Sequence, residues 1–98
     1  MAGFVQIMEF KTSRLEEIQA LMDDREPQRA AGTVRRLTVA ADRDRPGYHF
    51  TVVEFDSYES AMENSNRPET SEFAAKMAKL CDGPPTFRNL DVRFTWEP

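Results

Sequence analysis

The stretch from Tyr48 to Leu80 constrains the fold more than any other part of the chain. It begins with Tyr48–Phe55 (YHFTVVEF), where β-branched and aromatic residues occupy both alternating faces, as in a central strand that is covered on both sides. Asp56 then offers an N-cap oxygen, and Glu59 completes the spacing of a capping box. These residues predict a strand followed at once by a capped helix.

A second helical piece is predicted after this short helix. Asn66 can cap its start, with Pro68 in the first turn and Glu69 as the capping partner. Gly83 and the prolines after it give a strong stop signal. An apolar stripe at helical spacing lies between these signals and consists of Phe73, Met77 and Leu80.

The remaining segments add a helix and three strands. Phe4–Lys11 alternates as a strand. Ser13 with Glu16 repeats the capping-box spacing at the start of a helix that Pro27 should end. The apolar stripe of this helix is Leu15, Ile18, Leu21 and Met22. Two further strands are predicted at Thr33–Ala41 and Thr86–Trp96.

The connection between the second and third strands is short and charged. It runs over Asp42–Gly47 (DRDRPG), and Pro46-Gly47 suits the two central positions of a type II turn. The two strands are therefore antiparallel. The full order is βαββαβ, so we predict a single α+β domain over residues 1–98. It should contain a ferredoxin-like, four-stranded antiparallel sheet with both helices on one face.

Strand alternation divides the sheet residues into two sets. The more apolar set is expected to lie under the helices and contains Val5, Ile7, Leu37, Val39, Thr51, Val53, Phe55, Leu90, Val92 and Phe94. The other set mixes aromatic and charged side chains, so it is too apolar to face water and too charged for a monomer core. A second copy of the chain on this face resolves the conflict. We therefore predict a homodimer whose interface includes Met8, Phe10, Arg36, Phe50, Val52, Glu54 and Arg93.

Composition argues against several classes of partner. Seventeen acidic and thirteen basic residues give a net charge of −4, so no basic surface favours a nucleic acid or an anionic membrane. The one cysteine, Cys81, leaves no internal disulfide and fits a reducing cytoplasm. No apolar run is long enough to span a bilayer, and Met1-Ala2-Gly3 starts no signal peptide. We therefore expect a cytoplasmic protein.

Together these features resemble the dimeric α+β barrel superfamily, and within it the antibiotic-biosynthesis-monooxygenase-like domains. The segments that carry the likeness are GFVQIMEF at the start, EFDSYESAM at the strand-to-helix junction, and NRPE with DGPP around the last helix. The resemblance implies that two sheets face each other as a closed barrel. It also implies that ligands lie between each sheet and its own helices.

The same resemblance allows a residue-by-residue check of the chemistry. The cofactor-free, quinone-forming monooxygenases that the chain resembles use an asparagine, a tryptophan, a tyrosine and an arginine. Their positions fall on Thr51, Phe55, Met62 and Ala74, so all four of those groups are absent here. Haem-degrading members need an asparagine on the first strand and a histidine on a late helix, and the chain has neither. The resemblance therefore implies the fold without the inherited chemistry.

His49 is the single histidine, and histidine is the residue type that most often exchanges protons near neutral pH. It shares the strand phase of Thr51, so it is the candidate general base; the alternative is a strand-end histidine beside the turn. One histidine and one cysteine supply too few metal ligands, and no glycine-rich phosphate loop supports a nucleotide, so no cofactor is expected. The candidate ligand-binding residues are Thr51, Phe55, Met62, Ser65, Phe73 and Met77.

Three functions remain open at this point. The favoured one is a binding module that holds a small apolar or aromatic ligand between the sheet and the helices. The second is a cofactor-independent monooxygenase or isomerase that acts on a polyketide-like aromatic substrate, with His49 as its base. The third is a structural dimer with a protein partner.

Overall fold

The computed structural model of the chain describes residues 3–25 and 32–98. Its elements, in chain order, are β1 (Phe4–Lys11), α1 (Leu15–Asp24), β2 (Arg36–Ala41), β3 (Tyr48–Phe55), α3 (Tyr58–Ser65), α4 (Pro68–Leu80) and β4 (Thr86–Asp91).

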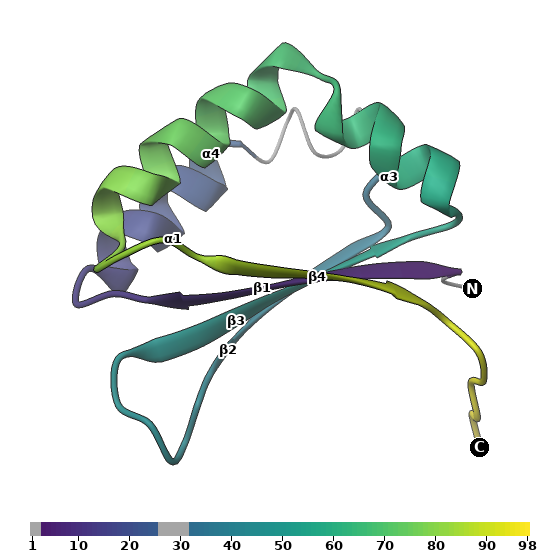
Figure 1. Cartoon of the computed structure of the whole chain (residues 1–98), viewed down its shortest axis with the longest axis horizontal. Helices are drawn as coiled ribbons and strands as arrows, with labels where there is room; N and C mark the ends of the chain where they lie inside the picture. The colour runs from purple at the N-terminus through teal and green to yellow at the C-terminus, as the bar shows by residue number, and fades with distance from the viewer. Residues whose placement is uncertain (1–2, 26–31) are drawn as a thin grey trace.

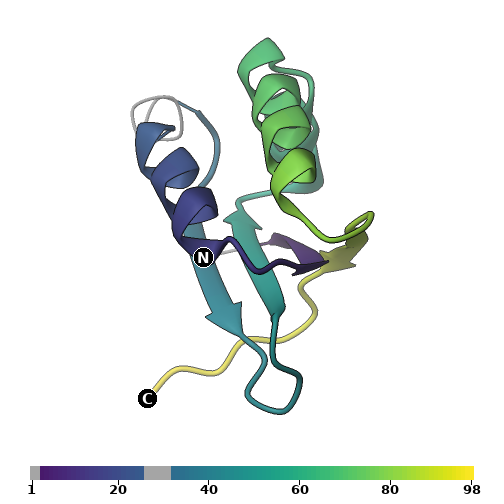
Figure 2. The same ribbon diagram turned by 90° about the vertical axis from the view of Figure 1, so that its left-hand side faces the viewer.

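The strands in the described residues form one four-stranded antiparallel sheet in the order β2-β3-β1-β4. β1 and β3 are therefore the central strands. Helices α1, α3 and α4 lie on the same face of this sheet (Figure 1), and the view from the side shows them as a separate layer (Figure 2). The predicted ferredoxin-like α+β fold is confirmed.

The register of the central strands decides which side chains lie under the helices. Met8 is opposite Thr51 and Phe10 is opposite His49, so the even-numbered residues of β1 share a face with the odd-numbered residues of β3. Phe10 is only 2% exposed and packs in the core below the helices. The prediction that Met8 and Phe10 belong to a dimer interface is therefore wrong.

The same correction applies to the other side of β1. Val5 and Ile7, which were expected under the helices, lie opposite Glu54 and Val52 on the uncovered face. Leu90 of β4 pairs with Val5 and shares that face. Alternation gave β2 and β3 the right faces, but it assigned β1 and β4 in the opposite phase.

Apolar packing between the helices and the sheet forms two clusters. One joins Phe10 to side chains of α1 and α4, and its buried members are Phe10, Ile18, Met22 and Met77. The other lies near α3, and its buried members are Phe4, Phe55 and Ala61. The apolar stripe predicted for α1 is confirmed, because Ile18 and Met22 are the buried residues of that helix.

The edge strands are shorter than the sequence suggested. β2 begins at Arg36 rather than Thr33, and β4 ends at Asp91 rather than Trp96. Arg93 lies beyond β4 and is exposed, so its place in an interface stays a prediction. Trp96 is 73% exposed.

The helix caps differ from the predicted capping boxes by a residue or more. α3 is capped by Ser57, whose hydroxyl accepts a hydrogen bond from the Ser60 N–H. Asp56 is engaged elsewhere, because its carboxylate accepts a hydrogen bond of 2.8 Å from Arg35. Asp56 and Ser57 are both of a residue type that can cap this helix. Because Asp56 is paired with Arg35, Ser57 forms the cap.

The other two caps also differ from prediction. The N-cap of α1 is Arg14, without a side-chain cap hydrogen bond, rather than Ser13; the Arg14 N–H itself donates a 2.9 Å hydrogen bond to the Thr12 hydroxyl. α4 begins with Pro68 at its first turn, as predicted, but its N-cap is Arg67, without a side-chain bond. α1 ends at Asp24, and the predicted stop at Pro27 lies outside the described residues.

The turn between β2 and β3 has the predicted type II geometry. Gly47 has a φ of +88°, and the Tyr48 N–H donates a 3.1 Å hydrogen bond to the Arg45 carbonyl. These are the third and fourth positions of the turn, and only the third requires a positive φ.

No helix within residues 3–25 and 32–98 is long and apolar enough to cross a membrane.

Candidate ligand pocket

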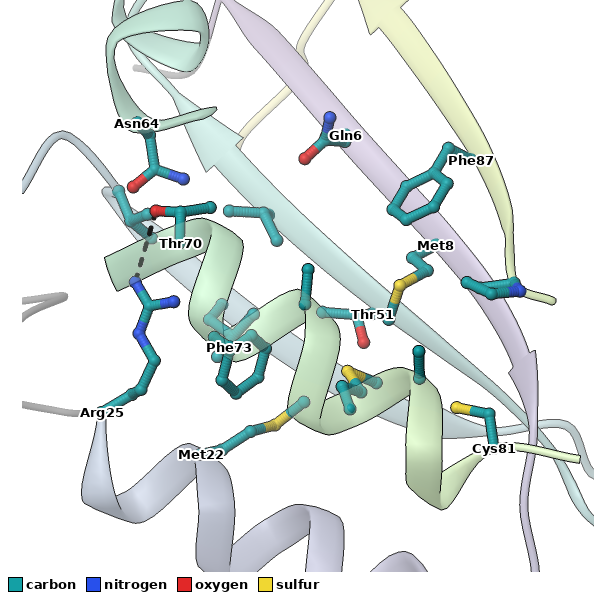
Figure 3. A pocket seen from close by; sticks show the side chains of 17 residues that line it. Gln6, Met8, Met22, Arg25, Thr51, Asn64, Thr70, Phe73, Cys81 and Phe87 are labelled. Atoms are coloured by element: carbon teal, nitrogen blue, oxygen red, sulfur yellow. Dashed lines mark hydrogen bonds between the residues drawn. The ribbon is translucent and has the colours of Figure 1, made fainter. Parts of the chain in front are cut away.

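A pocket of about 160 Å³ lies between the helices and the sheet. We call it the sheet–helix pocket. Met8, Thr51 and Val53 of the central strands form its floor, as Figure 3 shows for the labelled Met8 and Thr51. Leu37 and Phe87 bound it from the edge strands. The register explains this floor, because Met8 and Thr51 are cross-strand neighbours.

The opposite wall comes from α4 and the end of α1. Phe73 and Met77 of α4 line it together with Met22 of α1, and Phe73 and Met22 are labelled in Figure 3. Ala74 and Ala78 also line it, and as residues four apart they lie on one side of the helix. Two alanines at these positions leave space that larger side chains would fill. Phenylalanine and methionine around that space give a wall that is apolar and adaptable.

Thr51 places an unpartnered hydroxyl in this apolar floor. The residue is 5% exposed, and its Oγ1 has no hydrogen-bond partner in the described structure. Buried polar groups are normally hydrogen-bonded, and leaving one unpaired is unfavourable. Thr12, the other buried threonine, is fully used: its hydroxyl donates to the Leu80 carbonyl at 2.6 Å and accepts from Arg14. Of these two buried threonines, Thr51 is the one whose hydroxyl has no partner.

One end of the pocket is polar. Arg25, Asn64 and Thr70 gather there (Figure 3). The Arg25 guanidinium donates to the Glu69 carbonyl at 3.0 Å and reaches Thr70 Oγ1 at 3.5 Å. It also lies 4.9 Å from the centre of the Phe73 ring, a cation–π arrangement that fixes the ring. A ligand would therefore meet hydrogen-bonding groups at this end and mostly apolar groups elsewhere, apart from Thr51 and Gln6.

Cys81 lies on the wall of the pocket as a protonated thiol. Burial raises its pKa above the ordinary value, and the neighbouring Asp82 carboxylate raises it further. The thiolate, which is the nucleophilic form, is disfavoured at neutral pH. Cys81 therefore contributes to packing at the pocket wall rather than nucleophilic chemistry.

The predicted ligand-binding residues divide into two groups. Thr51, Phe73 and Met77 line the pocket. The structure does not bring the other three to it: Phe55 and Met62 pack in the cluster near α3, and Ser65 is an exposed residue at the end of that helix. Ala74, at the position of the resembled enzymes' arginine, does line the pocket.

His49 is buried away from the described lining of the pocket. It is 7% exposed, and its ring stacks on Phe10 with 5.5 Å between centroids. Its Nδ1 lies 3.1 Å from the Gly47 carbonyl of the turn. These contacts match the strand-end alternative. Catalysis by His49 stays a prediction.

Several pocket residues were not predicted. Gln6, Met8 and Phe87 were missed because β1 and β4 were assigned in the wrong phase. Met22 and Arg25 were missed as lining residues, although they stand three apart at the end of α1 and so share a helical face. Gln6 is held by Asn89, to whose side-chain oxygen it donates at 3.1 Å. Among the described residues, no group of His, Cys, Asp and Glu is arranged to hold a metal ion.

Comparison with known proteins gives a likeness of structure alone. No protein-family model matches the sequence, and a search of curated proteins finds no match. Solved structures match over almost the whole chain. SnoaB, a cofactor-independent oxygenase from Streptomyces nogalater, superposes with a TM-score of 0.80 at 12% identity, covering 97% of each chain.

Two further structures agree with this one. A candidate antibiotic biosynthesis monooxygenase from Deinococcus radiodurans has a TM-score of 0.77 at 11% identity, over 97% of each chain. A protein from Mycobacterium tuberculosis has a TM-score of 0.78 at 18% identity, over 98% of this chain and 100% of its own. At such identities the likeness establishes the fold alone. The chain therefore has the ferredoxin-like fold of the antibiotic-biosynthesis-monooxygenase-like proteins.

Proposed function

We propose that this protein binds a small, largely apolar aromatic molecule in the sheet–helix pocket, with an oxygen of the ligand hydrogen-bonded to Thr51. The observation that carries the proposal is the buried Oγ1 of Thr51, which has no partner. Leaving a buried hydroxyl unpaired costs about 1–3 kcal/mol. A ligand oxygen that reaches it recovers part of this free energy, which an apolar ligand of the same shape does not.

The size and lining of the pocket support an aromatic ring. Its volume of about 160 Å³ is close to the roughly 150 Å³ of an apolar cavity that admits benzene. None of the described lining residues is acidic, so nothing in them repels a phenolic or carbonyl oxygen. Such an oxygen can accept from or donate to a threonine hydroxyl.

Calorimetric titration of wild type and Thr51→Val with phenol and toluene tests the proposal. The two probes have nearly the same shape, and only phenol can bond to Thr51. The substitution should weaken phenol binding about fivefold to tenfold, as expected for one hydrogen bond of roughly 1 kcal/mol, and leave toluene binding equal or stronger. Thr12→Val is the matched control, because Thr12 lies outside the described lining, and it should change neither affinity. Absence of saturable phenol binding to wild type would overturn the proposal.

Turnover is the second candidate function, and it is motivated by structural neighbours such as SnoaB. SnoaB is a cofactor-independent oxygenase, and the alternative drawn from sequence is a monooxygenase or isomerase with His49 as base. The contacts of His49 with Phe10 and Gly47 favour binding over turnover. Oxygen consumption with an anthrone-type phenol and no added cofactor would support the alternative. An unchanged rate in His49→Ala would remove His49 from it.

We also propose that two copies pair through the uncovered face of the sheet. Within the described residues no helix covers this face (Figure 2). It presents apolar side chains on both central strands, namely Val5, Ile7, Phe50 and Val52, all of them half-buried. Arg36 and Glu54 on the same face lie 3.6 Å apart as a cross-strand ion pair, so part of its charge is compensated without a partner. This corrected set replaces Met8 and Phe10 in the interface.

A further inference from the structure

A second hollow, of about 320 Å³, lies between α1 and β2. We call it the α1–β2 hollow. Ile18 and Gln19 of α1 and Val39 of β2 are among its walls. Two side chains, Met22 and Leu37, line both this hollow and the sheet–helix pocket. They therefore form the partition between the two spaces.

We propose that the two spaces are one binding site and that the ligand carries an apolar extension, such as an alkyl chain, which passes between Met22 and Leu37 into the hollow. This deepens the proposed function and rests on it. The partition is suited to opening, because methionine is unbranched and can adopt alternative rotamers at small cost. Leu37 lies on edge strand β2, where it is only partly buried.

The lining of the hollow indicates what the extension must be. Ile18 and Val39 offer apolar walls, and Val39 is 40% exposed although it is an aliphatic side chain on the helix-facing side of the sheet. Gln19 and Asp23, both exposed, form the polar part of the lining. An alkyl chain therefore gains burial along the walls, and its far end approaches solvent. A ring confined to the inner pocket cannot use this surface.

The experiment is a titration of wild type with para-alkylphenols from ethyl to hexyl. Each methylene that enters the hollow should raise affinity by roughly threefold to fourfold. Val39→Asp places a charge in the hollow and should abolish this gain while phenol binds as before. Gln19→Trp fills the hollow from the exposed side of α1 and should do the same without a charge. Ala20→Asp and Ala20→Trp are the matched controls on α1, since Ala20 is exposed and outside the described lining of both spaces.

The outcomes separate this inference from the proposed function. A single continuous site is supported if affinity rises with alkyl chain length in wild type and in both Ala20 variants. The rise should be absent in Val39→Asp and in Gln19→Trp. An affinity that stays flat from ethyl to hexyl overturns the extension while leaving ring binding in place. A gain that survives in folded Val39→Asp and Gln19→Trp also overturns it, because the chain then lies elsewhere. If wild type binds neither phenol nor its alkyl derivatives, the proposed function itself fails.

Discussion

At the scale of single residues, the two buried threonines should respond in opposite ways to the same change. Thr51→Val removes a hydroxyl that has no partner and should raise the free energy of unfolding by about 1 kcal/mol. Thr12→Val removes a hydroxyl that joins α1 to the end of α4 through Arg14 and Leu80 and should lower it by about 1–3 kcal/mol. Urea denaturation of the ligand-free protein measures both. Equal losses in the two variants would mean that Thr51 is satisfied in solution.

Two surface carboxylates, Asp42 and Asp56, give a pH dependence whose sign follows from their ion pairs. Hydrogen bonds from Arg45 lower the pKa of Asp42, and those from Arg35 lower the pKa of Asp56, below the usual 3.8. These carboxylates therefore bind protons more readily in the unfolded chain than in the folded one. The stability that their ion pairs contribute is fully present above pH 3.8 and is lost as the pH falls through the lowered pKa values of the folded state.

The variant that tests this dependence carries Asp42→Asn and Asp56→Asn together. Its melting temperature should fall less on acidification than that of wild type. The matched control, Glu16→Gln with Glu17→Gln on the first turn of α1, removes the same charge and leaves both ion pairs intact. It should keep the wild-type acid loss. If the fall in melting temperature on acidification were reduced equally in the control, the effect would come from net charge and not from the two ion pairs.

The sequence could identify Thr51 as a pocket residue but could not show that its hydroxyl is unpaired. Strand phase placed Thr51 correctly, although both faces of β3 carry β-branched or aromatic residues. Pairing of a hydroxyl depends on atoms from other elements, which periodicity does not contain. The cap of α3 is a similar case: Asp56 and Ser57 are equally suitable by residue type, and the choice depends on Arg35, distant in sequence.

At the scale of elements, the β2–β3 hairpin depends on one backbone conformation. Gly47 has a φ of +88°, where a residue with a Cβ is strained. Gly47→Ala should therefore lower the free energy of unfolding by roughly 1–2 kcal/mol. An added Cβ meets nothing closer than 3.9 Å, so the loss reports the backbone rather than a clash. Arg43→Ala in the same loop should change stability by less than about 0.5 kcal/mol. If Gly47→Ala lowered the free energy of unfolding no more than Arg43→Ala does, the turn would not require a glycine at this position.

Strand β1 shows why alternation alone did not predict the pocket. Both of its faces are apolar: Phe4, Met8 and Phe10 on one, Val5 and Ile7 on the other. A pattern of period two fixes the faces within a strand but not the phase between strands. That phase comes from the pairing of Met8 with Thr51, which no local signal contains. The order and type of the elements could therefore be predicted from the sequence, whereas Met8, the contribution of β1 to the pocket floor, could not.

At the scale of the whole molecule, the uncovered face of the sheet is the feature that the isolated chain leaves unexplained. Val5, Ile7, Phe50 and Val52 are only half-buried there. Because each is already partly buried, covering the rest gains only part of the roughly 1.5–3 kcal/mol that full burial of such a side chain is worth. The Arg45 guanidinium lies 4.4 Å from the Tyr48 ring centre and 6.0 Å from that of Phe50, which covers only the end of the face near the turn. A second copy is the simplest cover for the rest.

Phe50→Asp therefore tests the dimer directly. It puts a carboxylate at the centre of the proposed interface, where burial without a partner is strongly unfavourable. Sedimentation at micromolar concentration should show a wild-type dimer and a Phe50→Asp monomer, while Ala20→Asp, which adds the same charge on the exposed side of α1, should remain dimeric. The pocket lies on the opposite face of the sheet, so a folded monomeric variant should still bind phenol. A monomeric wild type would contradict the pairing, and the apolar face would then require another partner.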